Sequence, residues 1–396
     1  MASPLLRFAL ADGRPATLLV SEASTVLAVD ETLVSSWDLC GRPYALVRNS
    51  GSYRRGLDGG LLLKREAAPD RARVRRRLNA GEGATVVEAA RQEAAMALEA
   101  LGPAAAEARD RLRTIVAMDK DALAADAARF LEASGPVGIL PPDQYLSLVV
   151  RLTEGCSWNA CTFCGLYREV PFRFRTPPEL ERHLEALRAY FGRSIALRRS
   201  IFLGDANALC LAQDRLLPLL ETVAQGLPGL PVFSFVDAWT GRRRSAGDWR
   251  ACAALGLRRV YVGLETGDPG LLAWLGKPGT PADAVRLVRS LHEAGLAAGV
   301  IVLVGAGGER FYEDHVRGTR ERLREMGLGR DDLLYFSEYV DDPSLAYGRR
   351  AAGATELQPL SAPRAAAQRA QIETAVRTRD GGLVRSAAYD LREFVY

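Results

Sequence analysis

Three cysteines lie close together in the middle of the chain. Cys156, Cys161 and Cys164 have the spacing C-x4-C-x2-C, and no histidine stands beside them. Thiolates are soft ligands, and three of them at this spacing suit an iron–sulfur cluster that has three protein ligands and one open iron. The spacing therefore predicts an iron–sulfur site with room for a further ligand.

Two other roles for these cysteines must be weighed. A structural zinc ion takes four ligands, so the fourth would have to come from far along the chain. A disulfide would use two of the cysteines and leave the third over. The candidates for a distant zinc ligand are His183, His292, His315, Cys40, Cys210 and Cys252. The cluster is favoured, and zinc stays the alternative.

The residues around the cysteines resemble a known family. Residues 151–168, RLTEGCSWNACTFCGLYR, are similar to the cluster loop of radical S-adenosylmethionine (SAM) enzymes, whose usual form is C-x3-C-x-aromatic-C. Phe163 stands at the aromatic position, and one extra residue separates Cys156 from Cys161. The resemblance covers about residues 145–339. Within the family, the chain is distantly similar to the oxygen-independent coproporphyrinogen oxidases and the elongator-type proteins.

The resemblance implies cofactors and a reaction. Cys156, Cys161 and Cys164 would hold a [4Fe–4S] cluster beside Phe163, and SAM would bind the open iron. One electron from the reduced cluster would cleave SAM to methionine and a 5′-deoxyadenosyl radical, which abstracts hydrogen from a substrate. An electron donor such as flavodoxin or ferredoxin and an oxygen-sensitive active state are also implied.

Two loops after predicted strands carry further candidates for SAM binding. Gly204 and Asp205 stand where the family has a Gly-Gly-Glu segment that holds the methionyl amino group, and a carboxylate can accept from an ammonium. Glu265 ends the fourth predicted strand in YVGLETGD, where the family often places an acceptor for ribose hydroxyls. Helix capping is the alternative for both acids.

Other side chains near the predicted strand ends are weaker candidates. Arg173 and Arg175 could pair with a carboxylate of SAM or of a substrate, or they could lie on the surface of an arginine-rich protein. Tyr167, Asp237 and Trp239 could line a substrate cavity. The residue that acts on the substrate stays unknown.

The elements that must position these residues repeat as strand, loop and helix. Such repeats predict parallel strands, with ligands collecting at their carboxyl ends. Six repeats fit a partial (β/α)6 barrel, which the family resemblance favours, although a doubly wound open sheet gives the same pattern. The strands are expected at residues 145–150, 200–203, 232–236, 259–264, 298–304 and 333–338.

The rest of this α/β chain is expected to form smaller parts. Residues 1–75 alternate apolar and polar positions between turn signals, which indicates a small β-rich module. Residues 76–140 have helical periodicity and predict a helical bridge to the partial barrel at residues 141–345. Residues 346–396 predict a C-terminal helix and a docking tail.

The composition argues against some classes of function. Hydrophobic residues make up 48% of the 396 residues, and the net charge of +4 is too small to indicate nucleic acid or an anionic membrane as a partner. No apolar run approaches the ~18–20 residues that span a bilayer, and no secretory signal opens the chain. Because half of the six cysteines lie in one metal-binding motif, we expect the reducing cytoplasm.

The expected function is that of a radical SAM enzyme acting on an unidentified substrate, with a small molecule favoured over nucleic acid. Two alternatives stay open. Some relatives of oxygen-independent coproporphyrinogen oxidases handle haem without turning over a substrate, so a haem-binding chaperone is one. An RNA-modifying radical SAM enzyme is the other, and the modest charge argues against it.

Overall fold

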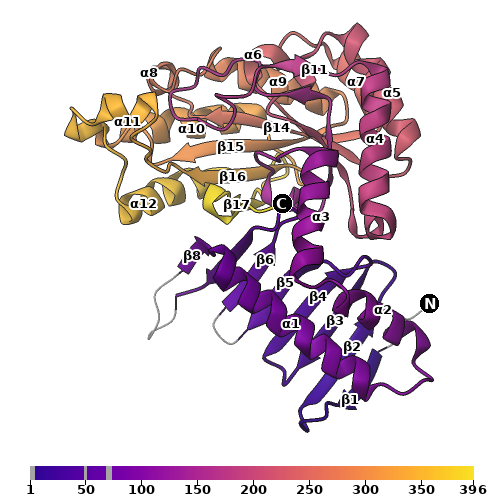
Figure 1. Cartoon of the computed structure of the whole chain (residues 1–396). Coiled ribbons are helices and arrows are strands. Elements are labelled where there is room, and N and C mark those ends of the chain that lie inside the picture. Colours follow the sequence, from indigo (N-terminus) through magenta and orange to yellow (C-terminus); the bar gives the residue numbers. More distant parts are fainter. Residues whose placement is uncertain (1–4, 49–50, 68–73) are drawn as a thin grey trace. The chain divides into compact units, whose positions relative to one another are not determined.

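The computed structural model describes residues 5–48, 51–67 and 74–396, and the chain forms two compact units (Figure 1). The first unit comprises Met1–Leu148, His183–Arg199 and Arg392–Tyr396, and the second comprises Val149–Arg182 and Ser200–Leu391. Each unit therefore gathers segments that are far apart in the sequence. The expected division into four consecutive parts stays a prediction.

The first unit contains an eight-stranded antiparallel sheet in which each strand pairs with the next one along the chain. The strands are β1 (Leu5–Ala9), β2 (Pro15–Val20), β3 (Ser24–Val29), β4 (Leu33–Asp38), β5 (Pro43–Arg48), β6 (Gly51–Arg55), β7 (Leu61–Arg65) and β8 (Val74–Arg77). In β2 and β3 every second side chain is buried, as in a sheet with one covered face. The β-rich character expected near the N-terminus is confirmed.

Two helices, α1 (Ala80–Ala100) and α2 (Ala106–Val116), share a hydrophobic core with this sheet, and α1 lies across its strands in Figure 1. α1 begins with a capping box, in which the Asn79 side chain accepts from the Glu82 backbone N–H and the Glu82 side chain accepts in return. The helices expected after the β-rich module are present, and two of them belong to its core.

A buried ionic network fixes a segment from the middle of the chain in the first unit. Asp126 lies on α3 (Lys120–Ser134) and accepts a hydrogen bond from Arg42 Nε at 2.8 Å. Arg42 also donates to the Ser194 hydroxyl at 2.8 Å and to the Tyr190 carbonyl oxygen at 2.9 Å. Because a buried charge is costly without partners, these contacts hold the two parts of the chain together.

The second unit contains a seven-stranded sheet in the order β17-β16-β15-β14-β13-β12-β9. The strands are β9 (Leu148–Arg151), β12 (Ile201–Gly204), β13 (Val232–Val236), β14 (Leu257–Glu265), β15 (Ala297–Val304), β16 (Leu333–Glu338) and β17 (Ser386–Ala388). Strands β12 to β17 pair in parallel. The order never reverses, so the partial barrel is confirmed and the doubly wound alternative is wrong.

Helices connect the strands of this sheet. The longer ones are α4 (Pro177–Phe191), α5 (Gln213–Gly226), α7 (Ala246–Ala254), α9 (Pro281–Glu293), α10 (Tyr312–Met326) and α12 (Ala362–Glu373), and the shorter ones are α6 (Ala238–Gly241), α8 (Pro269–Trp274) and α11 (Ala346–Ala351). α9 begins at a capping box of Thr280 and Asp283. In the part of the chain that the structure describes, no helix is long and apolar enough to cross a membrane.

One face of the parallel sheet carries a row of aromatic rings. Neighbouring ring centroids lie 5.0 to 6.4 Å apart. The rings belong to Phe202, Phe235, Tyr261, Tyr335 and Tyr389. Gly299 makes room for Tyr261, since a Cβ there would come within 2.4 Å of the ring. The row fills this face with apolar contacts, while polar groups gather at the strand ends.

Candidate active site

The cysteine stretch forms a loop that is pinned at its base. β10 (Thr153–Glu154) pairs antiparallel with β11 (Arg173–Phe174), so the chain leaves and returns at the same point. Glu154 accepts two hydrogen bonds from Arg173 at 2.7 Å each and one from Arg175 at 2.8 Å. Burial would raise the pKa of Glu154, but the two guanidinium groups outweigh it and lower the pKa. Both arginines therefore bind a carboxylate of this chain.

An ordered turn takes up the long spacing between the first two cysteines. Asn159 has a left-handed conformation with φ of 51°, which asparagine adopts more readily than most residues. Its backbone N–H donates to the Cys156 sulfur at 3.4 Å, and its side chain donates to the Tyr167 carbonyl oxygen at 2.8 Å. Arg168 donates to the carbonyl oxygens of the other two cysteines at 3.1 Å each. The extra residue thus fits without loosening the loop.

The cysteine thiols of this loop lie close enough to act on one another. Burial raises the pKa of Cys161 to about 12 and also raises the pKa of Cys164, and in both cases neighbouring loop cysteines add to the rise. All six cysteines, each in a described segment, are free thiols. The three loop cysteines therefore form one group of sulfur donors.

The chemistry of this donor set suits an iron–sulfur cluster. Within residues 5–48, 51–67 and 74–396, no group of three or more His, Cys, Asp or Glu side chains is arranged to hold one metal ion. In a [4Fe–4S] cluster each thiolate binds a different iron atom, so the three sulfurs need not meet at one centre. Residues 156–164 contain three thiols and no carboxylate, which suits iron–sulfur ligation.

Asp205 follows β12 and supports the base of the loop between β10 and β11, which is called the cluster loop below. Its Oδ1 accepts from Arg151 Nε at 3.0 Å, and its Oδ2 accepts from the Gly155 backbone N–H at 3.1 Å. Burial raises the pKa of Asp205, and Arg151 acts in the opposite direction. α5 begins at Gln213 behind Ala212, so the alternative that Asp205 caps this helix is wrong.

Glu265 ends β14 in a left-handed backbone conformation, with φ of 58°, at a point where the register with β15 shifts. Its carboxylate pairs with Lys277 Nζ at 2.5 Å, and the two side chains are only 10% and 13% exposed. Gly263 leaves room for this pair, because a Cβ there would come within 2.3 Å of the carboxylate and 2.4 Å of the ammonium. α8 is capped by Asp268, so the capping alternative for Glu265 is wrong.

The segment Trp274–Lys277 is bound to the cluster loop. Trp158 and Thr162 donate three hydrogen bonds to carbonyl oxygens of this segment, at 2.8 to 3.1 Å. These two residues flank Cys161 in the sequence, and the charge of Lys277 acts on the Cys161 sulfur. Burial alone would lower the pKa of Lys277, but its ionic partner and Cys161 outweigh that effect and raise the pKa.

A further polar group joins the loops after β12 and β13 to the cluster loop. Asn207 Nδ2 donates to Ser157 Oγ at 3.1 Å, to Thr240 Oγ1 at 3.2 Å and to the Asp237 carboxylate. Asp237 also accepts from the Thr240 backbone N–H at 2.8 Å as the N-cap of α6. Three successive strands, β12 to β14, are thus followed by polar groups that reach the cluster loop directly, through Asn207 or through Lys277.

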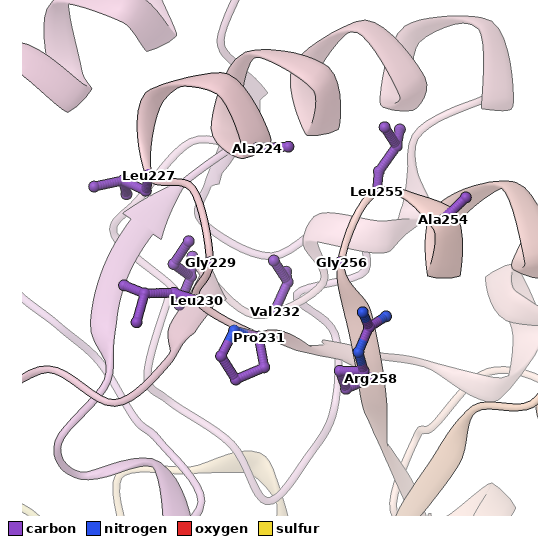
Figure 2. A pocket seen from close by; sticks show the side chains of 11 residues that line it. Ala224, Leu227, Gly229, Leu230, Pro231, Val232, Ala254, Leu255, Gly256 and Arg258 are labelled. Atoms are coloured by element: carbon purple, nitrogen blue, oxygen red, sulfur yellow. The ribbon is translucent and has the colours of Figure 1, made fainter.

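The pocket in Figure 2 lies at the opposite end of the same strands. Its lining includes Ile201 and Val232, the first residues of β12 and β13, and Gly256 just before β14. The other lining residues are apolar or glycine, except Arg258. The side chain of Arg258 donates hydrogen bonds to the carbonyl oxygens of Ala253 and Leu257. This pocket is therefore separate from the polar groups around the cysteines.

The three cysteines lie in a region that matches a protein-family model. Residues 150–319 match the model of the radical SAM superfamily. This stretch of the chain belongs to the radical SAM superfamily. The matched region runs from the end of β9 into α10, and it contains the three loop cysteines together with Asp205 and Glu265.

Individual known proteins are similar to this chain over limited lengths. An uncharacterised protein of Methanopyrus kandleri is 34% identical over 90 residues, which are 22% of this chain and 17% of that protein. The radical SAM methyltransferase TsrM of Kitasatospora setae is 18% identical with a TM-score of 0.40, over 61% of this chain and 49% of that one. Coproporphyrinogen III oxidase of Escherichia coli is 15% identical with a TM-score of 0.42, over 62% and 54%. The chain thus spans about half of each of these two structures.

The other residues predicted for a radical SAM site lie around the cluster loop. Phe163 packs against a hydrophobic cluster that includes side chains of α8 and α11. A Cβ at Gly204 would have its nearest neighbour at an ordinary 3.4 Å, so sterics do not demand glycine there. Tyr167 is buried, which raises its pKa. The Trp239 ring lies 6.2 Å from that of Trp158. The cofactor roles of Phe163 and Gly204 stay predictions.

Sequence reasoning missed Lys277 and Arg151. Lys277 is one of only three lysines in a chain with 52 Lys and Arg residues, which was the available signal. Its partner Glu265 is distant in sequence, and their meeting depends on the irregular end of β14. Arg151 directly follows the strand predicted at residues 145–150, at the carboxyl end where barrels of parallel strands place their ligand-binding groups.

Proposed function

We propose that the chain is an enzyme that binds a [4Fe–4S] cluster through Cys156, Cys161 and Cys164, binds SAM beside it, and acts on a substrate at the same end of the sheet. The cluster loop carries this proposal, since three interacting thiols lie on a pinned loop in the region that matches the radical SAM superfamily. Barrels of this kind bind their ligands at the carboxyl ends of the strands, where this loop begins.

When bound, the cluster and SAM supply a one-electron cleavage that yields a 5′-deoxyadenosyl radical able to abstract hydrogen. The chain itself holds the sulfur donors in place. Glu154 closes the base of the loop, and Asp205 fixes the backbone at Gly155 next to the first cysteine. These contacts restrict the cysteine side chains before the cluster binds, so that the cysteines lose less conformational freedom on binding it.

Glu265 and Asp205 are the residues that we assign to SAM. Glu265 ends β14 and offers carboxylate oxygens that can accept hydrogen bonds from ribose hydroxyls. Asp205 and Gly204 end the neighbouring loop after β12, and the carboxylate offers negative charge to the methionyl ammonium. Both Asp205 oxygens also accept hydrogen bonds from Arg151 and Gly155, so the same carboxylate holds the loop.

Anaerobic reconstitution tests the proposal. The full chain is incubated with iron and sulfide, reduced with dithionite and mixed with SAM, and iron content and 5′-deoxyadenosine are measured. We expect about four iron atoms per chain and 5′-deoxyadenosine from the wild type. The Cys161→Ala variant should lose both, because one iron atom then lacks its protein ligand.

The matched control is Cys40→Ala, which removes a free thiol outside the cluster loop and should retain iron and product. A wild-type protein that binds no iron, or product that survives Cys161→Ala, would contradict the proposal. Four iron atoms without any SAM cleavage would support the cluster and contradict the SAM chemistry.

We further propose that a small redox protein such as flavodoxin or ferredoxin supplies the electron, and that the substrate is a small molecule. The net charge of +4 is too low for the strong phosphate attraction of a nucleic-acid enzyme. Replacing dithionite with reduced flavodoxin should preserve 5′-deoxyadenosine formation. Product that appears only when tRNA is added would contradict the small-molecule assignment.

A further inference from the structure

Hydrogen bonds hold the segment that contains Lys277 against the part of the cluster loop that contains Cys161. The segment Trp274–Lys277 accepts hydrogen bonds from Trp158 and Thr162, which flank Cys161 in the sequence. A Cβ at Gly276 would come within 3.1 Å of the loop backbone, so the segment and the loop are in close contact there. The position of Lys277 is therefore coupled to the position of Cys161.

The ammonium of Lys277 occupies space that is open only because residue 263 is a glycine. It forms an ion pair with Glu265 in which both side chains are nearly buried, and Gly263 provides the room. A nearly buried charge acts over distance more strongly than one in water, because little solvent screens it. A lysine that served only to keep the surface soluble would not require a buried partner or a glycine beside it.

The two charges of this pair are attached to the protein in different ways. Lys277 follows Gly276, where a Cβ would lie 3.1 Å from Ala160 and 3.2 Å from Thr162, the two neighbours of Cys161 in the chain. Glu265 belongs to the end of β14 and meets this segment through its ion pair with Lys277. The positive charge is therefore the member of the pair that belongs to the segment bound at Cys161.

We propose that Lys277 raises the reduction potential of a [4Fe–4S] cluster bound through Cys161, and that Glu265 limits this effect. Reduction adds one electron from a low-potential donor to the cluster and makes or breaks no bond. The added negative charge is stabilised by a nearby ammonium. This inference rests on the proposed function, because it requires the cluster.

The test compares midpoint potentials of the reconstituted full chain, titrated with dithionite and followed by electron paramagnetic resonance. Lys277→Met removes the charge and keeps an unbranched side chain, and we expect its potential to be the most negative. Lys277→Met combined with Glu265→Gln removes both charges, and we expect a potential between those of Lys277→Met and the wild type. The control Lys120→Met changes the net charge equally at an exposed site of α3 and should match the wild type.

Iron content is measured on every variant, so that loss of the cluster and a shift of its potential are distinguished. Lys277→Met leaves Glu265 without its partner and risks poor folding. The double variant has no unpaired charge and must still lie below the wild type. Equal potentials in the double variant and the wild type, both with full iron, would overturn the inference. A wild type without iron would overturn the proposed function as well.

Discussion

Gly263 shows how a residue without a side chain becomes part of a site. A Cβ at this position would meet the carboxylate of Glu265 and the ammonium of Lys277 at 2.3 and 2.4 Å. Its backbone is not among those with a left-handed φ, so the demand for glycine comes from space alone. The residue therefore acts through the ion pair that it admits.

We expect Gly263→Ala to lower the free energy of unfolding by about 1–3 kcal/mol, because the added methyl group must displace a nearly buried ion pair. Urea unfolding of the metal-free protein measures this loss. Gly353→Ala is the control, since a Cβ there meets nothing within 4 Å. Equal stability of both variants would show that the pair moves aside freely.

At the level of secondary structure, one carboxylate joins the amino ends of two neighbouring strands, and we call this group of contacts the Asp332 clasp. Asp332, just before β16, accepts from the backbone N–H groups of Ala298 and Gly329 at 2.6 Å each. It also pairs at 2.9 Å with His292, in the last turn of α9. One side chain thus ties β15, β16 and α9 together.

This clasp predicts a pH-dependent stability. Burial would raise the pKa of Asp332, but His292 and the two backbone N–H groups outweigh it and lower the pKa. A carboxyl group whose pKa falls on folding stabilises the protein above its unfolded pKa, and this stabilisation is lost as the pH drops through the folded value. Asp332→Asn should therefore cost about 1–3 kcal/mol near neutral pH, and this cost should shrink as the pH falls below the ordinary aspartate value of about 4 and through the lowered pKa of Asp332.

Urea unfolding at several pH values measures the difference between the wild type and Asp332→Asn. The exposed neighbour Asp331 serves as the control, and Asp331→Asn should change stability little at any pH. A constant difference for Asp332→Asn across this pH range would argue that the carboxylate charge does not stabilise the clasp.

The sequence revealed elements more readily than their contacts. The sequence predicts the strand at residues 232–236 with its observed bounds, because four of its five residues are Val or Phe. β17 (Ser386–Ala388) has no such run and was missed. Helical periodicity predicted α1 and α2 but could not show that a sheet covers their apolar faces. The three cysteines stood out by spacing, whereas the Glu265–Lys277 pair depends on a shift in strand register.

For the whole molecule, the first unit depends on residues that are distant in sequence. Arg42 binds Asp126 of α3 and also Tyr190 and Ser194, which follow the cluster loop in the chain. Burial would lower the pKa of Arg42, but its acidic partners outweigh that effect and raise the pKa. The guanidinium therefore stays charged and needs all of these contacts.

We expect Arg42→Met to destabilise the first unit by about 3–5 kcal/mol, because it leaves the buried Asp126 carboxylate without its main partner. Thermal and urea unfolding followed by circular dichroism measure this loss. Arg7→Met on exposed β1 is the control and should have little effect. A small effect of Arg42→Met would mean that water or another group compensates the carboxylate.

The participation of Arg392–Tyr396 in the first unit has a consequence for folding during synthesis. The Tyr396 carbonyl oxygen accepts from the Leu57 backbone N–H at 2.8 Å, and the Phe394 carbonyl oxygen accepts from Arg77 at 2.8 Å. The ribosome makes Leu57 and Arg77 long before their acceptors exist. Domains near the N-terminus generally fold first, as the chain emerges. Here the unit that contains the first strands can complete its hydrogen bonds only after residues 392–396 have left the ribosome.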